Sequence, residues 1–283
     1  FNCGAVLEIP QNVEIEKPIV IVTRIDREKS GSSLFPRIFV KAGNHSKVTL
    51  INVFTSGTKS KTPADKLSFV NAQANVVAEA GANVSYIEIQ DLSDDVFLVS
   101  KNTSTVARDA ICTSLTVGIS GYQLKSEIVT RLKERGASGA MLGVVVGDKN
   151  EHLSYNTVQI HDAPDTTSDI NFRIALKDKA VSAYQGNIVV AKDAQKTNAF
   201  QSNKNLLLGK EAKADSIPKL EILANDVKCS HGATVGPVDE NQVFYLMTRG
   251  LDKETAEELI LAGFFDTVLE SFPDKTANDW IHE

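Results

Sequence analysis

Several features are scarce in this chain of 283 residues, and each absence excludes a class of protein. There are only three cysteines, Cys3, Cys112 and Cys229, far apart and odd in number. They build no disulfide framework and suit a reducing compartment. No CxxC or HExxH motif occurs, so we expect no closed zinc site made by this chain alone. No apolar run approaches the roughly 18 residues that a membrane span requires, so we expect no membrane partner.

Basic residues are also fewer than acidic residues. Lysine and arginine number 30 against 36 acidic residues, a net charge of -6, which argues against nucleic acid as a partner. Neither a GxGxxG nor a GxxxxGK[ST] loop is present, so no nucleotide site of either type is expected. The chain opens with Phe1-Asn2-Cys3 and no initiator methionine. We interpret it as a fragment whose natural N-terminal segment is missing.

Short apolar runs are the dominant pattern from residue 17 to about 235. They are four to seven residues long, rich in Val, Ile, Leu and Thr, and bounded by Gly, Asn, Asp and Lys. Such runs predict β-strands, and residues 47–54 and 83–90 alternate most clearly between apolar and polar positions. Helical periodicity is absent here, which argues against an alternating βαβ fold.

An internal repeat narrows the fold class. Two small or apolar residues followed by a polar residue and an acid recur at intervals of 15, 18 and 15 positions. We expect each unit to hold two or three short strands, and stacked units to bury a continuous apolar column. A β-sandwich has no reason to repeat a turn at this spacing, so the pattern favours a parallel β-helix (solenoid). The copies are Ala175-Leu-Lys-Asp178, Val190-Ala-Lys-Asp193, Leu208-Gly-Lys-Glu211 and Leu223-Ala-Asn-Asp226.

The sequence changes character after the repeats. Asp239 is a helix N-cap candidate and Gly250 a stop, while Asp252 begins a second helix that runs to about Phe272, before Pro273. We expect this helical hairpin to cover one end of the solenoid, since open strand edges need a cap. One face of the second helix is apolar, formed by Leu259, Ile260, Phe264, Val268 and Leu269.

These patterns predict two parts. Residues 1–236 form the β-helix core domain, and residues 237–283 form a C-terminal helical subdomain.

Acidic residues offer one candidate catalytic cluster. Asp162, Asp165 and Asp169 could supply the carboxylates of a β-helix polysaccharide lyase or hydrolase, although their spacing around Pro164 is more typical of a solvated loop. His161 and Asp162 could form an acid–base pair, but adjacent residues on a strand point to opposite faces.

A second candidate site contains Cys229 and His231. Two positions apart on a strand, they share a face, and thiolate and imidazole are ligands that iron and zinc prefer. Two ligands cannot close a tetrahedral site, so a second chain would have to complete it. On the chemistry alone, a buried cysteine and a hydrogen-bonded histidine is the more ordinary interpretation.

The same segment resembles a known family. Lys228-Cys-Ser-His-Gly-Ala-Thr-Val-Gly236, with the run from Asp239 to Leu251, is similar to the C-terminal signature of the SufB/SufD family of iron–sulfur cluster assembly proteins. Residues 197–209 and 218–222 also resemble it. The resemblance implies a right-handed parallel β-helix with flanking helical regions, and an N-terminal helical region that this sequence does not include.

Within the family, the chain resembles SufD more than SufB. SufB carries an acidic residue before the histidine, where this chain has Ser230. SufB also places its sulfur-accepting cysteine in the stretch that matches Gln201 to Leu208, which contains no cysteine here. The resemblance therefore implies a subunit that does not build a cluster alone.

The resemblance also implies partners and a location. A complex with SufB and the ATPase SufC would form in the cytoplasm or a plastid stroma, with iron or an iron–sulfur cluster held transiently at the interface with SufB. His231 would be a ligand, Cys229 a weaker one, and the isolated chain could form a homodimer. The chain itself would not be an enzyme. The terminal helices would dock SufC through Phe244, Tyr245, Phe264 and Phe265, although we expect most of these aromatics to pack against the β-helix.

Two alternatives stay open. One is the β-helix carbohydrate-active enzyme built on the acids at 162–169. The other is a purely structural partner that stabilises SufB without binding iron, which differs from the leading hypothesis only in the role of His231.

Overall fold

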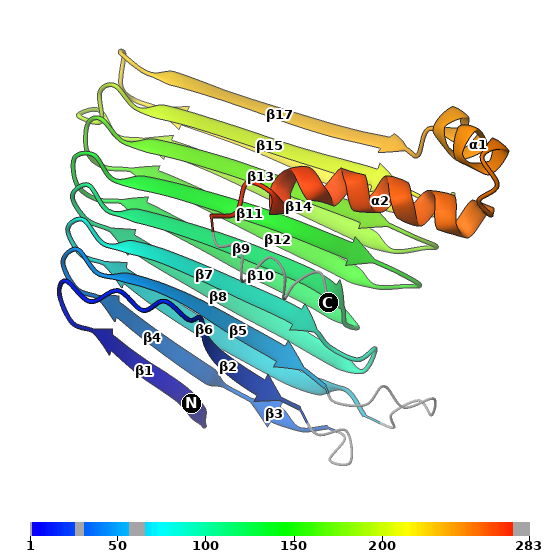
Figure 1. Cartoon of the computed structure of the whole chain (residues 1–283), viewed down its shortest axis with the longest axis horizontal. Helices are drawn as coiled ribbons and strands as arrows, with labels where there is room; N and C mark the ends of the chain where they lie inside the picture. The colour runs from blue at the N-terminus through cyan, green and yellow to red at the C-terminus, as the bar shows by residue number, and fades with distance from the viewer. Residues whose placement is uncertain (1, 26–30, 57–65, 274–283) are drawn as a thin grey trace.

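The computed structural model describes residues 2–25, 31–56 and 66–273. Over these residues, the chain forms seventeen β-strands followed by two α-helices (Figure 1). The elements are β1 (Cys3–Ile9), β2 (Ile19–Arg24), β3 (Ser33–Leu34), β4 (Pro36–Ala42), β5 (Lys47–Thr55), β6 (Ser68–Ala78), β7 (Asn83–Asp91), β8 (Val96–Val106), β9 (Ile111–Ser120), β10 (Gln123–Leu132), β11 (Ser138–Gly147), β12 (His152–His161), β13 (Thr167–Leu176), β14 (Val181–Val190), β15 (Asn198–Leu207), β16 (Lys213–Ile222), β17 (Lys228–Pro237), α1 (Glu240–Thr248) and α2 (Lys253–Leu269).

The strands build two stacked parallel sheets. Sheet A has the order β1-β4-β6-β8-β10-β12-β14-β16, with β3 beside β6, and sheet B has the order β17-β15-β13-β11-β9-β7-β5-β2. The chain passes from one sheet to the other after almost every strand, which produces a β-solenoid of about eight turns. The predicted parallel β-helix is confirmed, and the two face-to-face antiparallel sheets of a sandwich are not present in the described residues.

The repeat has a simpler basis than the sequence suggested. From β9 to β17 each strand is ten residues long, and one repeat holds one strand and one turn, which is half a coil. The expectation of two or three strands of four to seven residues per unit was wrong. Outward-facing polar residues in mid-strand, such as Lys204 in β15, resemble turn residues in the sequence and hide the continuity of the strand.

Stacked turns keep the coils in register. His45, Asp109 and Asp165 occupy equivalent turn positions with left-handed backbone (φ of 55°, 53° and 56°), and a small buried residue follows each one. The backbone N–H of His45 donates to the Ala80 carbonyl one coil further on at 3.0 Å, and the Asp109 N–H donates to Arg135 at 3.2 Å. Each turn is thereby fixed by the next, so the coil length stays nearly constant.

The interior of the solenoid is close-packed. Rings of Tyr155, Phe172 and Tyr184 stack at its centre, with centroids 6.1 and 5.3 Å apart, and all three are fully buried. Burial of each aromatic side chain stabilises the fold by roughly 1.5–3 kcal/mol. The apolar column expected from the repeat is therefore present.

Both predicted helices form, with the predicted caps. The Asp239 carboxylate accepts from the Asn241 backbone N–H at 2.9 Å, and the Asp252 carboxylate accepts from Thr255 at 2.8 Å.

We expected the helices to cover one end of the solenoid, and this prediction was wrong. Instead, α2 lies across the outer face of sheet B over β11 and β13, while α1 lies beyond the end of β17 (Figure 1). The cause is the outer face of sheet B, which is apolar and needs a cover. Phe265, Val268, Leu269 and Phe272 are buried there against Ile87, Ile89, Leu115, Val117, Leu142 and Val144.

The apolar face predicted for α2 is right at Val268 and Leu269, which are buried, and at Phe264, which packs partly buried on the same cluster, but it is wrong at one position. Leu259, expected on the buried face, is exposed, whereas Ala256 and Phe265 are buried. The predicted division at residue 237 stays a prediction, and residues 274–283 of the second part lie outside the described residues.

Candidate metal site at the open end of the solenoid

The C-terminal end of the solenoid is open. Most residues of β16 and β17 are exposed or half-buried, in contrast with the inner strands, and β17 is hydrogen-bonded within its sheet to β15 alone among the described strands. These two strands are the last of their sheets, and no further strand of the described chain covers their inward-facing side chains. We call this region the open mouth: residues 213–222 and 228–237.

Cys229 and His231 both point toward the open mouth. Cys229 packs against the interior core and is half-buried, and His231, two residues further along β17, faces the same side and is exposed. The shared face predicted from the sequence is therefore present. Among the described residues, no group of three or more His, Cys, Asp or Glu side chains comes together, so this part of the chain adds no third candidate ligand to Cys229 and His231.

The two candidate ligands differ in how easily they could bind a metal. Burial raises the pKa of the Cys229 thiol, while a hydrogen bond with the backbone of Ala199 partly opposes the shift. The thiol thus keeps its proton at neutral pH and binds a metal only by releasing it. His231 is therefore the more available candidate ligand.

The coil beneath the open mouth is rich in amides, which the sequence analysis missed. In strand register, Gln201 is the partner of His231, and Ala199 is the partner of Cys229. Asn205 donates to Asn203 at 2.7 Å, and Ser216 donates to the same Asn203 oxygen at 2.6 Å. The signal in the sequence was three amides at alternate positions of β15, the strand one coil before the Cys-Ser-His segment of β17.

The four aromatic candidates on the helices fall into two pairs. Phe244 is 67% exposed and Tyr245 56% exposed, both on α1. Phe265 is buried under α2, and Phe264 stacks on Arg173 of β13. A groove of about 490 Å³ separates α1 from the ends of β15 and β17, lined on its apolar side by Leu207, Leu208, Pro237, Val243, Phe244 and Met247.

The acidic cluster at 162–169 is dispersed. Asp162 pairs with Arg131, and Asp165 pairs with Arg135 at 2.8 Å, whereas Asp169 lies on the other sheet. His161 is buried inside the solenoid, where Thr166 and Ser168 bond its two ring nitrogens at 2.8 and 2.9 Å. Burial lowers its pKa to about 4, so it is a neutral structural residue. No acid–base pair with Asp162 forms, as the strand geometry predicted.

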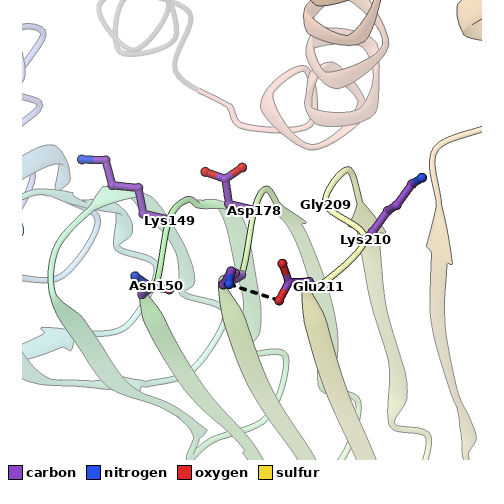
Figure 2. Close-up of a pocket in the computed structure, with 7 residues that line it drawn as sticks. Lys149, Asn150, Asp178, Gly209, Lys210 and Glu211 are labelled. Carbon is purple, nitrogen blue, oxygen red and sulfur yellow. Dashed lines mark ion pairs between the residues drawn. The ribbon is translucent and has the colours of Figure 1, made fainter.

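A hollow of about 400 Å³ lies on the turns that lead from sheet B to sheet A. Figure 2 shows Lys149, Asp178 and Lys210 pointing outward from successive turns, while Glu211 turns toward an ion-pair partner. Lys179 is paired with Glu211 at 3.2 Å across the hollow. This arrangement is a solvated row of charged side chains on successive turns.

A buried polar layer crosses the solenoid near β7. The Glu88 carboxylate accepts from Gln90 at 2.7 Å and from the Tyr86 hydroxyl at 3.3 Å, and Gln90 also bonds Ser126 and Tyr155, at 2.9 Å each. Burial raises the pKa of Glu88, and its named hydrogen-bond partners are neutral. Sequence reasoning missed this group because one acid within an apolar strand resembles an outward-facing residue.

Comparison with known proteins identifies the family. The model of the SUF system FeS cluster assembly SufBD core domain matches residues 23–264. The chain belongs to this SufBD core family.

Curated members of the family resemble the chain along most of its length. SufD of Bacillus subtilis is 31% identical over 273 residues, which are 96% of this chain and 61% of that protein. SufD of Escherichia coli is 31% identical over 211 residues, 75% of this chain and 50% of that protein. SufB of Bacillus subtilis is 27% identical over 275 residues, 96% of this chain and 57% of that protein. The chain thus spans about three fifths of the length of the Bacillus SufD that it matches.

The family membership accounts for the fold and for the signature around His231. It adds a functional context, iron–sulfur cluster assembly, that composition could not provide. Within the described residues, neither helix has the length and apolar character needed to cross a bilayer.

Proposed function

We propose that this chain is a SufD-type scaffold subunit of a complex with SufB-type and SufC-type partners, and that it supports iron–sulfur cluster assembly without being an enzyme. The observation that carries the proposal is the position of His231. It is an exposed imidazole on the last strand of an open solenoid, beside one thiol and without further ligands in the described chain.

The open mouth favours a second β-helix as its cover. Edge strands expose unpaired backbone N–H and C=O groups, which are templates for pairing with another chain. The open mouth also exposes apolar side chains, since Ile217 and Val235 are about half exposed. A SufB-type chain with the same coil dimensions would extend both sheets and bury these rows. In its absence, a second copy of this chain could occupy the same edge as a homodimer.

Such a junction would complete the ligand set. His231 supplies a neutral nitrogen, Cys229 a sulfur after loss of its proton, and the SufB-type partner the remaining ligands. Iron or a cluster would be cargo at this junction, held transiently. The raised pKa of the Cys229 thiol makes His231 the principal ligand and Cys229 the secondary one.

The terminal helices supply a second contact. Phe244 and Tyr245 on α1 are exposed beside an apolar groove, which is the arrangement that an aromatic anchor of a partner interface requires. We assign this surface to the SufC-type ATPase. Because α2 is anchored on sheet B, movement of the ATPase would act on the solenoid as a whole. A cytoplasmic or stromal location, with reduced thiols, suits this chemistry.

The test is anaerobic reconstitution of the complex with its SufB-type and SufC-type partners. His231→Ala is expected to leave complex formation intact and to reduce bound iron and cluster absorbance at least tenfold. His152→Ala is the matched control, since His152 is an exposed histidine on β12 of sheet A, outside the open mouth and on the other sheet from His231. Normal iron loading by the His231→Ala complex would contradict the proposal and favour a purely structural subunit.

The carbohydrate-active alternative gains no support from the structure. A carbohydrate-active β-helix would need the acids at 162–169 free and convergent, whereas Asp162 and Asp165 are each paired with an arginine.

A further inference from the structure

Gln201 is an anomaly in the interior of the solenoid. It is 3% exposed, yet neither its amide oxygen nor its amide nitrogen has a hydrogen-bond partner among the described residues. Buried amides are usually satisfied, because an unpaired polar group loses its hydration without compensation. The opposite sheet leaves room for this side chain, because Gly186 of β14 in sheet A has no Cβ, and a Cβ added there would lie 2.2 Å from the Gln201 amide nitrogen. The fold therefore accommodates an unsatisfied amide where an apolar residue would cost less.

The position of Gln201 indicates what it is for. It is the register partner of His231 in the adjacent strand, and both side chains face the interior. Neighbouring parallel strands lie about 4.8 Å apart, which puts the two side chains within reach of each other. Gln201 is buried and His231 is exposed to solvent, so His231 lies on the last strand and Gln201 one coil further inside the solenoid.

We infer that Gln201 is the positioning residue for His231. When a partner covers the open mouth and excludes water, the ring N–H of His231 and the amide of Gln201 both need a partner, and each is the nearest in register. The amide oxygen accepts the ring N–H, which fixes the tautomer and leaves the lone pair of the other ring nitrogen for iron. Histidine ligands generally donate their second N–H in this way, and loss of the acceptor lowers metal affinity about 10–100-fold.

This inference rests on the proposed function, and the two can fail separately. The test measures Fe²⁺ affinity of the anaerobic complex with its SufB-type and SufC-type partners, for wild type and four variants. Gln201→Leu removes the acceptor, and Gln201→Glu retains it. Gln159→Leu is the matched control, because Gln159 is a buried interior glutamine of β12 whose amide oxygen is also unpartnered in the described structure. His231→Ala reports on the site itself.

The inference predicts that Gln201→Leu weakens Fe²⁺ binding 10–100-fold, that Gln201→Glu stays within about threefold of wild type, and that Gln159→Leu changes nothing. The ¹⁵N chemical shifts of the His231 ring in the complex should move toward a tautomer mixture in Gln201→Leu alone. If His231→Ala loses iron while Gln201→Leu binds like wild type, or if both leucine variants weaken binding equally, the role of Gln201 is refuted and the proposed function stands. If His231→Ala binds iron normally, the proposed function itself fails.

Discussion

The guanidinium of Arg173 lies 5.0 Å from the centre of the Phe264 ring and donates a 2.6 Å hydrogen bond to the Phe264 carbonyl oxygen. Arg173 belongs to β13 and Phe264 to α2, so this contact joins the terminal helix to the outer face of sheet B. Phe265 is buried beside it in the same apolar cluster. Helix α2 thus covers the outer face of sheet B and is fixed to it.

This anchoring predicts a large effect of Phe265→Ala on stability. Loss of a buried phenylalanine should lower the free energy of unfolding by about 3–5 kcal/mol. Leu259→Ala, an exposed position on the same helix, should change it by less than about 0.5 kcal/mol. Urea unfolding of both variants measures the difference. Equal, small effects would show that α2 is not held on sheet B in solution.

His161 predicts a loss of stability in mild acid. Burial holds its pKa at about 4, below the ordinary value of 6.5, with a smaller opposing effect from Asp162. Between these values the unfolded chain takes up a proton that the folded chain excludes, so the stability present above pH 6.5 declines toward pH 4, by at most roughly 3 kcal/mol. The free energy of unfolding of His161→Gln should lack this component. His152 is exposed, so the His152→Gln variant should retain the wild-type dependence of unfolding free energy on pH. If the His161→Gln variant also shows the wild-type dependence, the assignment is contradicted.

Glu88 predicts the opposite dependence. Burial raises its pKa, so the folded chain keeps a proton that the unfolded chain has already lost above about pH 4.5. Stability from this group is therefore present in acid and declines as the pH rises. Glu88→Gln should be more stable than wild type at pH 8, and the difference should shrink toward pH 4. Glu127→Gln, which alters an exposed acid paired with Lys101, serves as control, and an equal gain from that variant would exclude a role of burial.

The exposed aromatics of α1 predict a specific loss of ATPase binding. Phe244→Asp should weaken binding of a SufC-type ATPase at least tenfold, because it places a charge in the apolar groove beside α1. Leu259→Asp, on the exposed side of α2, should bind normally. Isothermal titration with the purified ATPase provides the measurement, and unchanged affinity of the Phe244→Asp variant would move the docking surface elsewhere.

The sequence predicted the solenoid because its signals are local. Turns that require left-handed backbone, as at Asp109 and Asp165, recur at every coil, and alternation along strands is preserved. The caps of both helices were also readable, since Asp239 and Asp252 act on their own neighbours. Strand length could not be predicted from the sequence, because lysines and asparagines whose side chains face outward resemble turn residues.

Long-range contacts could not be predicted from the sequence. The placement of α2 depends on the apolar outer face of sheet B, which is assembled from strands far apart in the chain. The same holds for Gln201, whose importance comes from its register with His231, and for Glu88, whose burial depends on the opposite sheet. The Cys229–His231 pair was predicted because two residues on one strand share a face by period alone.

The central claim is that a SufB-type chain covers the open mouth and brings His231 into the junction. Hydrogen–deuterium exchange of backbone amides, measured with and without that partner, tests it most directly. The account predicts that amides of β17, which exchange readily in the isolated monomer, become protected in the complex, while exposed amides of β1 at the opposite end are unchanged. Unaltered exchange along residues 228–237 in a complex shown to be assembled would contradict it.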